Sequence, residues 1–232
     1  MVTEKQKFDS SVSLVKQFCP SFQISLKRNS LVHRIIGWIL AKTGNKAYMT
    51  DYITTLGQSV ALPTHYESSN ISDMWQIILH EGRHAVDAKK FTNVLFGLLY
   101  LFPQILGILG VIYTLAILPV IAYGGPLALL WGSLATLFLA PLPACFRAYF
   151  EVRGYLTSLA CYYWSGRLTP EDEPIHVANI SYMFTSGAYY YMWPFDWIIE
   201  PYFIKKIKQL KDGTIKLDSY LAACKDLAIS FK

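Results

Sequence analysis

The order of hydrophobic and charged positions divides the chain into two polar parts and one long apolar stretch. No Asp, Glu, Lys or Arg occurs between residues 91 and 146, whereas charged residues are frequent on both sides. A membrane-spanning helix needs roughly 20 apolar residues, so this stretch is long enough for two. The pattern predicts an N-terminal part at 1–90, an apolar helical hairpin at 91–146 and a C-terminal helical part at 147–232.

Two antiparallel helices are expected within the apolar stretch. The first is predicted at 94–118, with Pro103 accommodated as a kink, and the second at 127–142. The sequence YGGP at 123–126 marks the turn between them. Because polar residues are sparse in both helices, we interpret the hairpin as transmembrane; burial against partner subunits or in a virus particle is the alternative. Two passes return the chain to the side it left, so the two polar parts can complete one catalytic-type domain.

The polar parts predict a mainly helical fold with a small β-hairpin or sheet. Residues 47–63 (AYMTDYITTLGQSVALP) are rich in Tyr, Thr, Ile and Val around a glycine, a pattern typical of paired strands. The run 71–79 contains Ser72 and Asp73, either of which would cap a helix formed by the apolar residues that follow. A final amphipathic helix is expected at 217–232. The predicted fold class is α+β, mainly α.

The helix expected after residue 73 contains the motif HEGRH at residues 80–84. Residues four apart lie on the same side of a helix, so His80 and His84 point in the same direction and could share one metal ion. Neutral imidazole is a good ligand for Zn²⁺. Glu81 is rotated by about 100° from His80 around the helix, which suits a general base that takes a proton from metal-activated water. Two histidines on a polar helix face are the alternative.

A hydrolytic zinc site usually takes three protein ligands, so a third is expected. Glu151 is the stronger candidate, because a carboxylate among apolar and aromatic residues needs a partner such as a metal. An ion pair with Arg147, one helical turn earlier, is the alternative for Glu151. Asp87, three residues after His84, could be the third ligand instead, or could orient one of the histidines.

This pattern resembles the gluzincin-type zinc metallopeptidases, in which HExxH lies on one helix and a glutamate of a later helix is the third ligand. The resemblance covers residues 47–90 and 147–165 and is carried by His80, Glu81, His84 and Glu151. It implies a zincin-like fold and a strand before the metal helix that holds an extended peptide by edge pairing. The chain departs from the family at Tyr155, where an aspartate is expected. The overall pattern also looks like small metallopeptidase-like proteins of bacteria and tailed phages.

The resemblance leaves open which side chain stabilises the oxyanion of amide hydrolysis. Tyr155 and His176 are the candidates for this role. A structural role is the alternative for His176, which follows the turn at 169–174.

Composition favours a membrane or another very apolar environment. Hydrophobic residues make up 53% of the chain and charged residues 16%, below the share of about 25% in typical soluble domains. The net charge of +5 suits an anionic membrane surface, whereas the scattered basic residues argue against specific nucleic-acid binding. Basic residues flank the apolar stretch, so the positive-inside tendency places the polar parts in the cytoplasm. The four cysteines form no CxxC pair and are expected to be free thiols.

One further apolar segment, 31–41 (LVHRIIGWILA), is too short to span a membrane. With Arg28, Arg34 and Lys42 around it, this segment could lie on a membrane surface, or it could form a core helix.

Together these patterns predict a membrane-associated zinc peptidase with Glu81 as the general base. Its expected partners are membrane lipid, a peptide or protein substrate and, in an oligomer or larger assembly, other protein chains. The alternative is an integral membrane or phage virion protein that retains a metal site for a structural role or as a relic.

Overall fold

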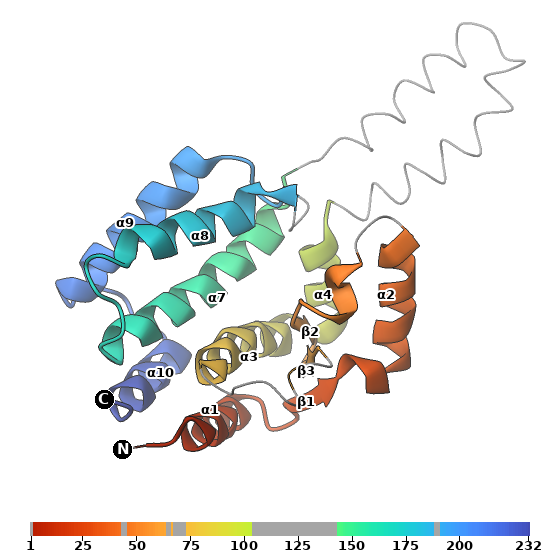
Figure 1. Ribbon diagram of the computed structural model, residues 1–232, viewed down its shortest axis with the longest axis horizontal. Helices are drawn as coiled ribbons and strands as arrows, with labels where there is room; N and C mark the ends of the chain where they lie inside the picture. The colour runs from red at the N-terminus through yellow and green to blue at the C-terminus, as the bar shows by residue number, and fades with distance from the viewer. Residues whose placement is uncertain (1, 43–45, 64–65, 67–72, 104–142, 188–190) are drawn as a thin grey trace, which may run out of the picture.

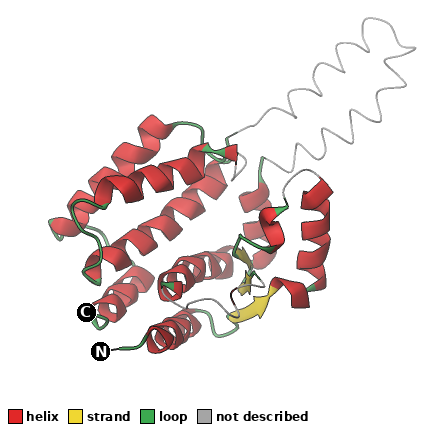
Figure 2. Ribbon diagram, in the orientation of Figure 1, coloured by secondary structure: helices red, strands yellow, loops and turns green. Residues whose placement is uncertain are grey.

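The computed structural model describes residues 2–42, 46–63, 66, 73–103, 143–187 and 191–232. Helices dominate this part of the chain, and a small sheet lies beside them, so the predicted mainly helical class with a small sheet is confirmed (Figure 2). The helices are α1 (Glu4–Phe18), α2 (Leu31–Lys42), α3 (Met74–Phe91), α4 (Asn93–Leu101), α7 (Cys145–Trp164), α8 (Glu173–Thr185), α9 (Asp196–Lys211) and α10 (Ser219–Ile229), with short 3₁₀ helices η1 (Lys27–Asn29) and η2 (Ala47–Met49).

The sheet consists of β1 (Gln23–Leu26), β2 (Thr54–Leu56) and β3 (Ser59–Leu62) in the order β1-β3-β2. Strands β2 and β3 are antiparallel and are joined by a turn at Gly57, whose φ of +61° suits a residue without a Cβ. This hairpin confirms the strand pair expected within 47–63. β1 adds to β3 in parallel, which leaves β2 at an edge of the sheet.

Helix α3 packs between α1 and α7 and provides much of the core (Figure 1). Trp75, Ile78 and Leu79 are fully buried on α3 among residues of the neighbouring helices. Gly82 lies inside this helix although glycine is a weak helix former. Its role is steric, because a Cβ at this position would collide with Val15 and with the hydroxyl of Tyr220. A close approach of α1 and α10 to α3 therefore requires the glycine of HEGRH.

Helix α7 is shared by two groups of buried side chains. One side contributes Ala160 and Cys161 to the core around α3, and the other contributes Leu159 to a cluster with α8 and α9. α7 is thus held from both sides, and its position against α3 is fixed.

Cys161 and the chain's other cysteines are all free thiols, as predicted.

The predicted apolar hairpin lies largely in 104–142, outside the described residues. Its described beginning corrects one detail, because α4 ends at Leu101 and the helix predicted to continue through Pro103 stops before that proline. Proline has no amide hydrogen, and it disfavours the helical conformation of the residue before it. Among the helices of the described ranges, none has both the length and the apolar character that a membrane crossing needs.

Candidate metal centre

The two segments predicted to bind a metal meet where α3 packs against α7. His80 and His84 lie one turn apart on α3, and Glu151 faces them from α7. Nε2 of His80 lies 3.2 Å from Nε2 of His84, and the two nitrogens lie 3.6 and 3.7 Å from the carboxylate oxygens of Glu151. The fold therefore brings three potential ligand atoms within 4.8 Å of one another.

These separations fit a single tetrahedral ion. Two atoms bonded to zinc at about 2.0–2.1 Å in tetrahedral geometry are about 3.3 Å apart. The two histidine nitrogens are 3.2 Å apart, close to this value. Each nitrogen lies 3.6 or 3.7 Å from a different oxygen of Glu151, so a small rotation of the carboxylate would bring one oxygen into position for a shared ion. Two imidazole nitrogens and one carboxylate oxygen also form a donor set found in hydrolytic zinc sites, although other divalent transition metals accept the same donors.

The three side chains are withdrawn from solvent, and the pKa shifts of Glu151 and His84 favour the forms that bind a cation. Glu151 and His84 are each only 4% exposed. Burial alone would raise the pKa of Glu151, but the neighbouring His84 and His80 hold that pKa well below its usual range. Burial lowers the pKa of His84, which favours the neutral imidazole that binds metals. The centre thus keeps Glu151 ionised, and although burial opposes it, the hydrogen bond to this carboxylate raises the pKa of His80.

Helix α7 also fixes the position of His80. The hydroxyl of Ser158 lies 3.2 Å from Nδ1 of His80, and the ring of Tyr155 packs edge-on against the imidazole with centroids 4.9 Å apart. Gly154 lies against the same ring, since a Cβ at this position would be 2.7 Å from Nε2 of His80. The other histidine is held differently, because Nδ1 of His84 is buried with no hydrogen-bond partner among the described residues.

Glu151 has a further partner that sequence reasoning missed. The hydroxyl of Tyr100, on α4, donates a hydrogen bond to one carboxylate oxygen of Glu151. The guanidinium of Arg147 lies over the Tyr100 ring, 5.1 Å from its centroid, and adds positive charge beside the carboxylate. In the sequence, Tyr100 stands out only as a hydroxyl-bearing residue within the otherwise apolar run 94–101. This feature alone does not identify Glu151 as its partner.

Glu81 lies beside the three ligand candidates and is turned towards the sheet. The hydroxyl of Thr55, on β2, donates a hydrogen bond to Oε2 of Glu81. The two candidates for oxyanion stabilisation share this side of the centre, because Tyr155 and His176 line the same cavity of 360 Å³ as His80 and Glu81. His80 and the expected base Glu81 therefore border one space together with both candidates, whereas His84, Glu151 and the residues of β2 do not line it.

Asp87, the alternative third ligand, has a different partner. Its carboxylate accepts hydrogen bonds of 2.9 and 3.0 Å from the guanidinium of Arg153 on α7, and it also lies 3.6 Å from Arg83. Arg83 in turn pairs with Asp218, next to α10. This network joins α3, α7 and α10, whereas the group of ligand candidates found in the described residues contains Glu151 and not Asp87.

A larger cavity of 710 Å³ adjoins a different part of α7. Its lining is mostly apolar and includes Val152, Leu156, Ile199 and Leu221. None of the three ligand candidates borders this cavity, so the larger space is not where the described chemistry would take place.

Comparison with known proteins identifies no relative of this chain. No protein-family model, no curated protein and no solved structure matches the chain.

Proposed function

We propose that the protein is a zinc-dependent metallohydrolase, and specifically a peptidase. The observation that carries the proposal is the approach of His80, His84 and Glu151 to one another in a buried site. When bound there, zinc would supply Lewis-acid activation of a water molecule and of the substrate carbonyl.

Glu81 is the proposed general base. It neighbours the metal ligands in sequence and space but is not one of the three, so its carboxylate is free to accept a proton from water. The hydrogen bond from Thr55 holds that carboxylate on the side of the cavity. Tyr155 and His176 border the same space, and we propose them as candidates to stabilise the oxyanion.

The proposed substrate is a peptide in extended conformation. β2 is an edge strand whose outer side has no strand neighbour among the described residues, so its backbone groups could pair with a peptide. Thr55 belongs to β2 and contacts Glu81, so a peptide paired with this strand would pass beside the proposed base.

We extend the proposal to a membrane location, with the polar parts in the cytoplasm. It is supported by the uncharged stretch 91–146, whose length would allow two crossings, and by the basic residues at both ends of the stretch.

Metal removal tests this function. We expect 1,10-phenanthroline to abolish hydrolysis of fluorescently labelled casein by the detergent-purified full chain, and one equivalent of Zn²⁺ to restore it after the chelator is removed. The expected loss is at least about 100-fold, because both water activation and carbonyl polarisation depend on the ion. Far-UV circular dichroism recorded in parallel would show whether the fold survives chelation. Full activity of a folded, metal-free protein, or no hydrolysis by the zinc-loaded protein, would refute the proposal.

A further inference from the structure

The outward side of α2 is apolar, the reverse of what a helix on a water-exposed surface shows. Five large hydrophobic side chains on this helix are between 49% and 67% exposed, and together we name them the α2 face: Leu31, Val32, Ile35, Trp38 and Ile39. At 100° per residue they occupy one stripe about 120° wide. The buried positions of the helix are instead His33 and Gly37.

Packing on η2 fixes this orientation of α2. Nδ1 of His33 lies 2.8 Å from the hydroxyl of Tyr48, and a Cβ at Gly37 would be 2.7 Å from the side chain of Met49. His33 and Gly37 thus form the inner side of α2, which packs against η2. Rotation of α2 to bury the stripe would break both contacts, so the exposure of the α2 face is a stable property of the fold.

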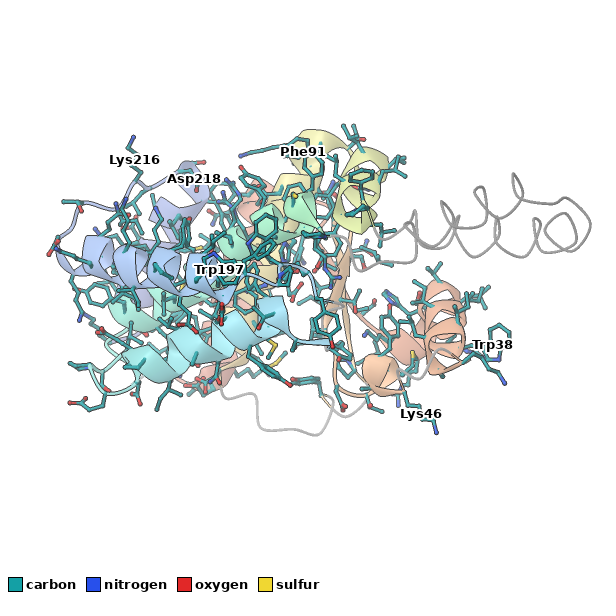
Figure 3. All side chains as sticks on the ribbon, turned by 90° about the horizontal axis from the view of Figure 1, so that it is seen from above. Trp38, Lys46, Phe91, Trp197, Lys216 and Asp218 are labelled. Carbon is teal, nitrogen blue, oxygen red and sulfur yellow. The ribbon has the colours of Figure 1, made fainter. Side chains whose placement is uncertain are left out.

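Helix α4 repeats this arrangement at the same end of the molecule (Figure 1). Val94, Leu98 and Leu101 are 74%, 51% and 50% exposed, whereas Phe96 is buried and Tyr100 points inward to Glu151. In Figure 1 α2 and α4 lie at the end opposite α9, and Figure 3 shows that Trp38 projects outward from α2. Two helices thus expose apolar stripes at one end of the protein.

The charges on α2 and on the segments directly before and after it are of one sign. No Asp or Glu occurs between residues 10 and 50. Within that range the exposed basic residues around the helix are Arg28, Arg34, Lys42 and Lys46, while Lys27 is buried and donates to the carbonyl of Tyr48. An apolar stripe with a tryptophan and a basic border matches a helix that lies in the headgroup region of an anionic bilayer.

We propose that the α2 face docks on an anionic lipid surface, with α2 lying in the plane of the interface. Lipid fits better than a protein partner, because the exposed charges on α2 and next to it in the sequence up to residue 50 are all positive. In addition α4, which exposes its own stripe at this end, belongs to the uncharged stretch 91–146. This inference rests on the membrane location of the proposed function and does not depend on a bound metal.

Quenching of tryptophan fluorescence by brominated lipid tests the contact directly. The detergent-purified full chain would be reconstituted with vesicles of 70% brominated phosphatidylcholine and 30% phosphatidylglycerol. The fluorescence of Trp38 would be obtained as the difference between the wild type and Trp38→Phe. We expect that contribution to be quenched at least about twofold. The matched control is Trp197→Phe, because Trp197 is as exposed as Trp38, 67% against 66%, but lies elsewhere (Figure 3). Its contribution should be unquenched.

A charge reversal tests the lipid class. We expect Arg34→Glu with Lys42→Glu to abolish the quenching of Trp38, and the paired change Lys205→Glu with Lys208→Glu on α9 to leave it intact. Vesicles of neutral phosphatidylcholine alone should give little quenching of Trp38 in any variant.

Three results would overturn the inference: no quenching of Trp38, equal quenching by neutral and anionic vesicles, or a dimer in sedimentation without lipid that Trp38→Glu dissociates. The last would show that a second copy covers the α2 face. Zinc content should be the same in wild type and Trp38→Phe, so failure of this inference is distinguishable from failure of the metal site.

Discussion

Replacement of Glu81 by glutamine is expected to lower kcat for peptide hydrolysis by about 100- to 10,000-fold while zinc content stays at the wild-type level. Glutamine has nearly the same size and can still accept the hydrogen bond of Thr55, but its amide cannot accept a proton from water. Initial rates on labelled casein, together with elemental analysis of the same preparation, would measure both quantities.

The control for this variant is Glu200→Gln, the same change at an exposed position of α9, which should leave the rate unchanged. Two outcomes would contradict the role of Glu81. Wild-type kcat in Glu81→Gln would show that another group takes the proton, and a loss of zinc would show that Glu81 is a ligand.

The second large effect is expected at Gly154, on metal affinity. An added methyl group would lie 2.7 Å from Nε2 of His80, so alanine should displace the imidazole from the centre. We expect Gly154→Ala to weaken zinc binding about 10- to 100-fold, the range seen when residues that orient metal ligands are altered. Competition with a chromogenic chelator would measure the dissociation constants.

Gly97→Ala is a matched control, because Gly97 also lies within a helix but a Cβ there meets no atom within 4 Å. This variant should bind zinc like the wild type and gain up to about 1 kcal/mol in unfolding free energy from helix propensity. Unchanged zinc affinity in folded Gly154→Ala would mean that Nε2 of His80 is not a ligand in the arrangement described.

Those parts of the fold that depend on local sequence could be predicted. The helix that carries HEGRH begins at Met74, directly after the predicted cap position, although Asp73 makes no capping hydrogen bond with its side chain. The turn at Gly57 and the strands around it follow from short-range preferences for β-structure. The approach of Glu151 to the histidines also agrees with the prediction, because the pattern of a buried carboxylate gave a reason to expect it.

Features that depend on packing between distant segments could not be predicted. The pairing of Thr55 with Glu81 and of Tyr100 with Glu151 requires particular positions of β2 and α4, which no periodicity specifies. The partner of Asp87 depends likewise on how Arg153 projects from α7. The sequence allowed α2 to be either a surface helix or a core helix. It is a surface helix because of the contact between His33 and Tyr48, which belong to separate helices.

Metal content is the most direct test of the central claim, that His80, His84 and Glu151 bind zinc. Elemental analysis would compare the detergent-purified wild type with His80→Ala and Glu151→Ala after zinc reconstitution and removal of free metal. We predict about one zinc per chain in the wild type, none in His80→Ala and a substoichiometric amount in Glu151→Ala, where two ligands remain. A wild type without metal would contradict the claim, and the HEGRH helix would then serve a structural role alone.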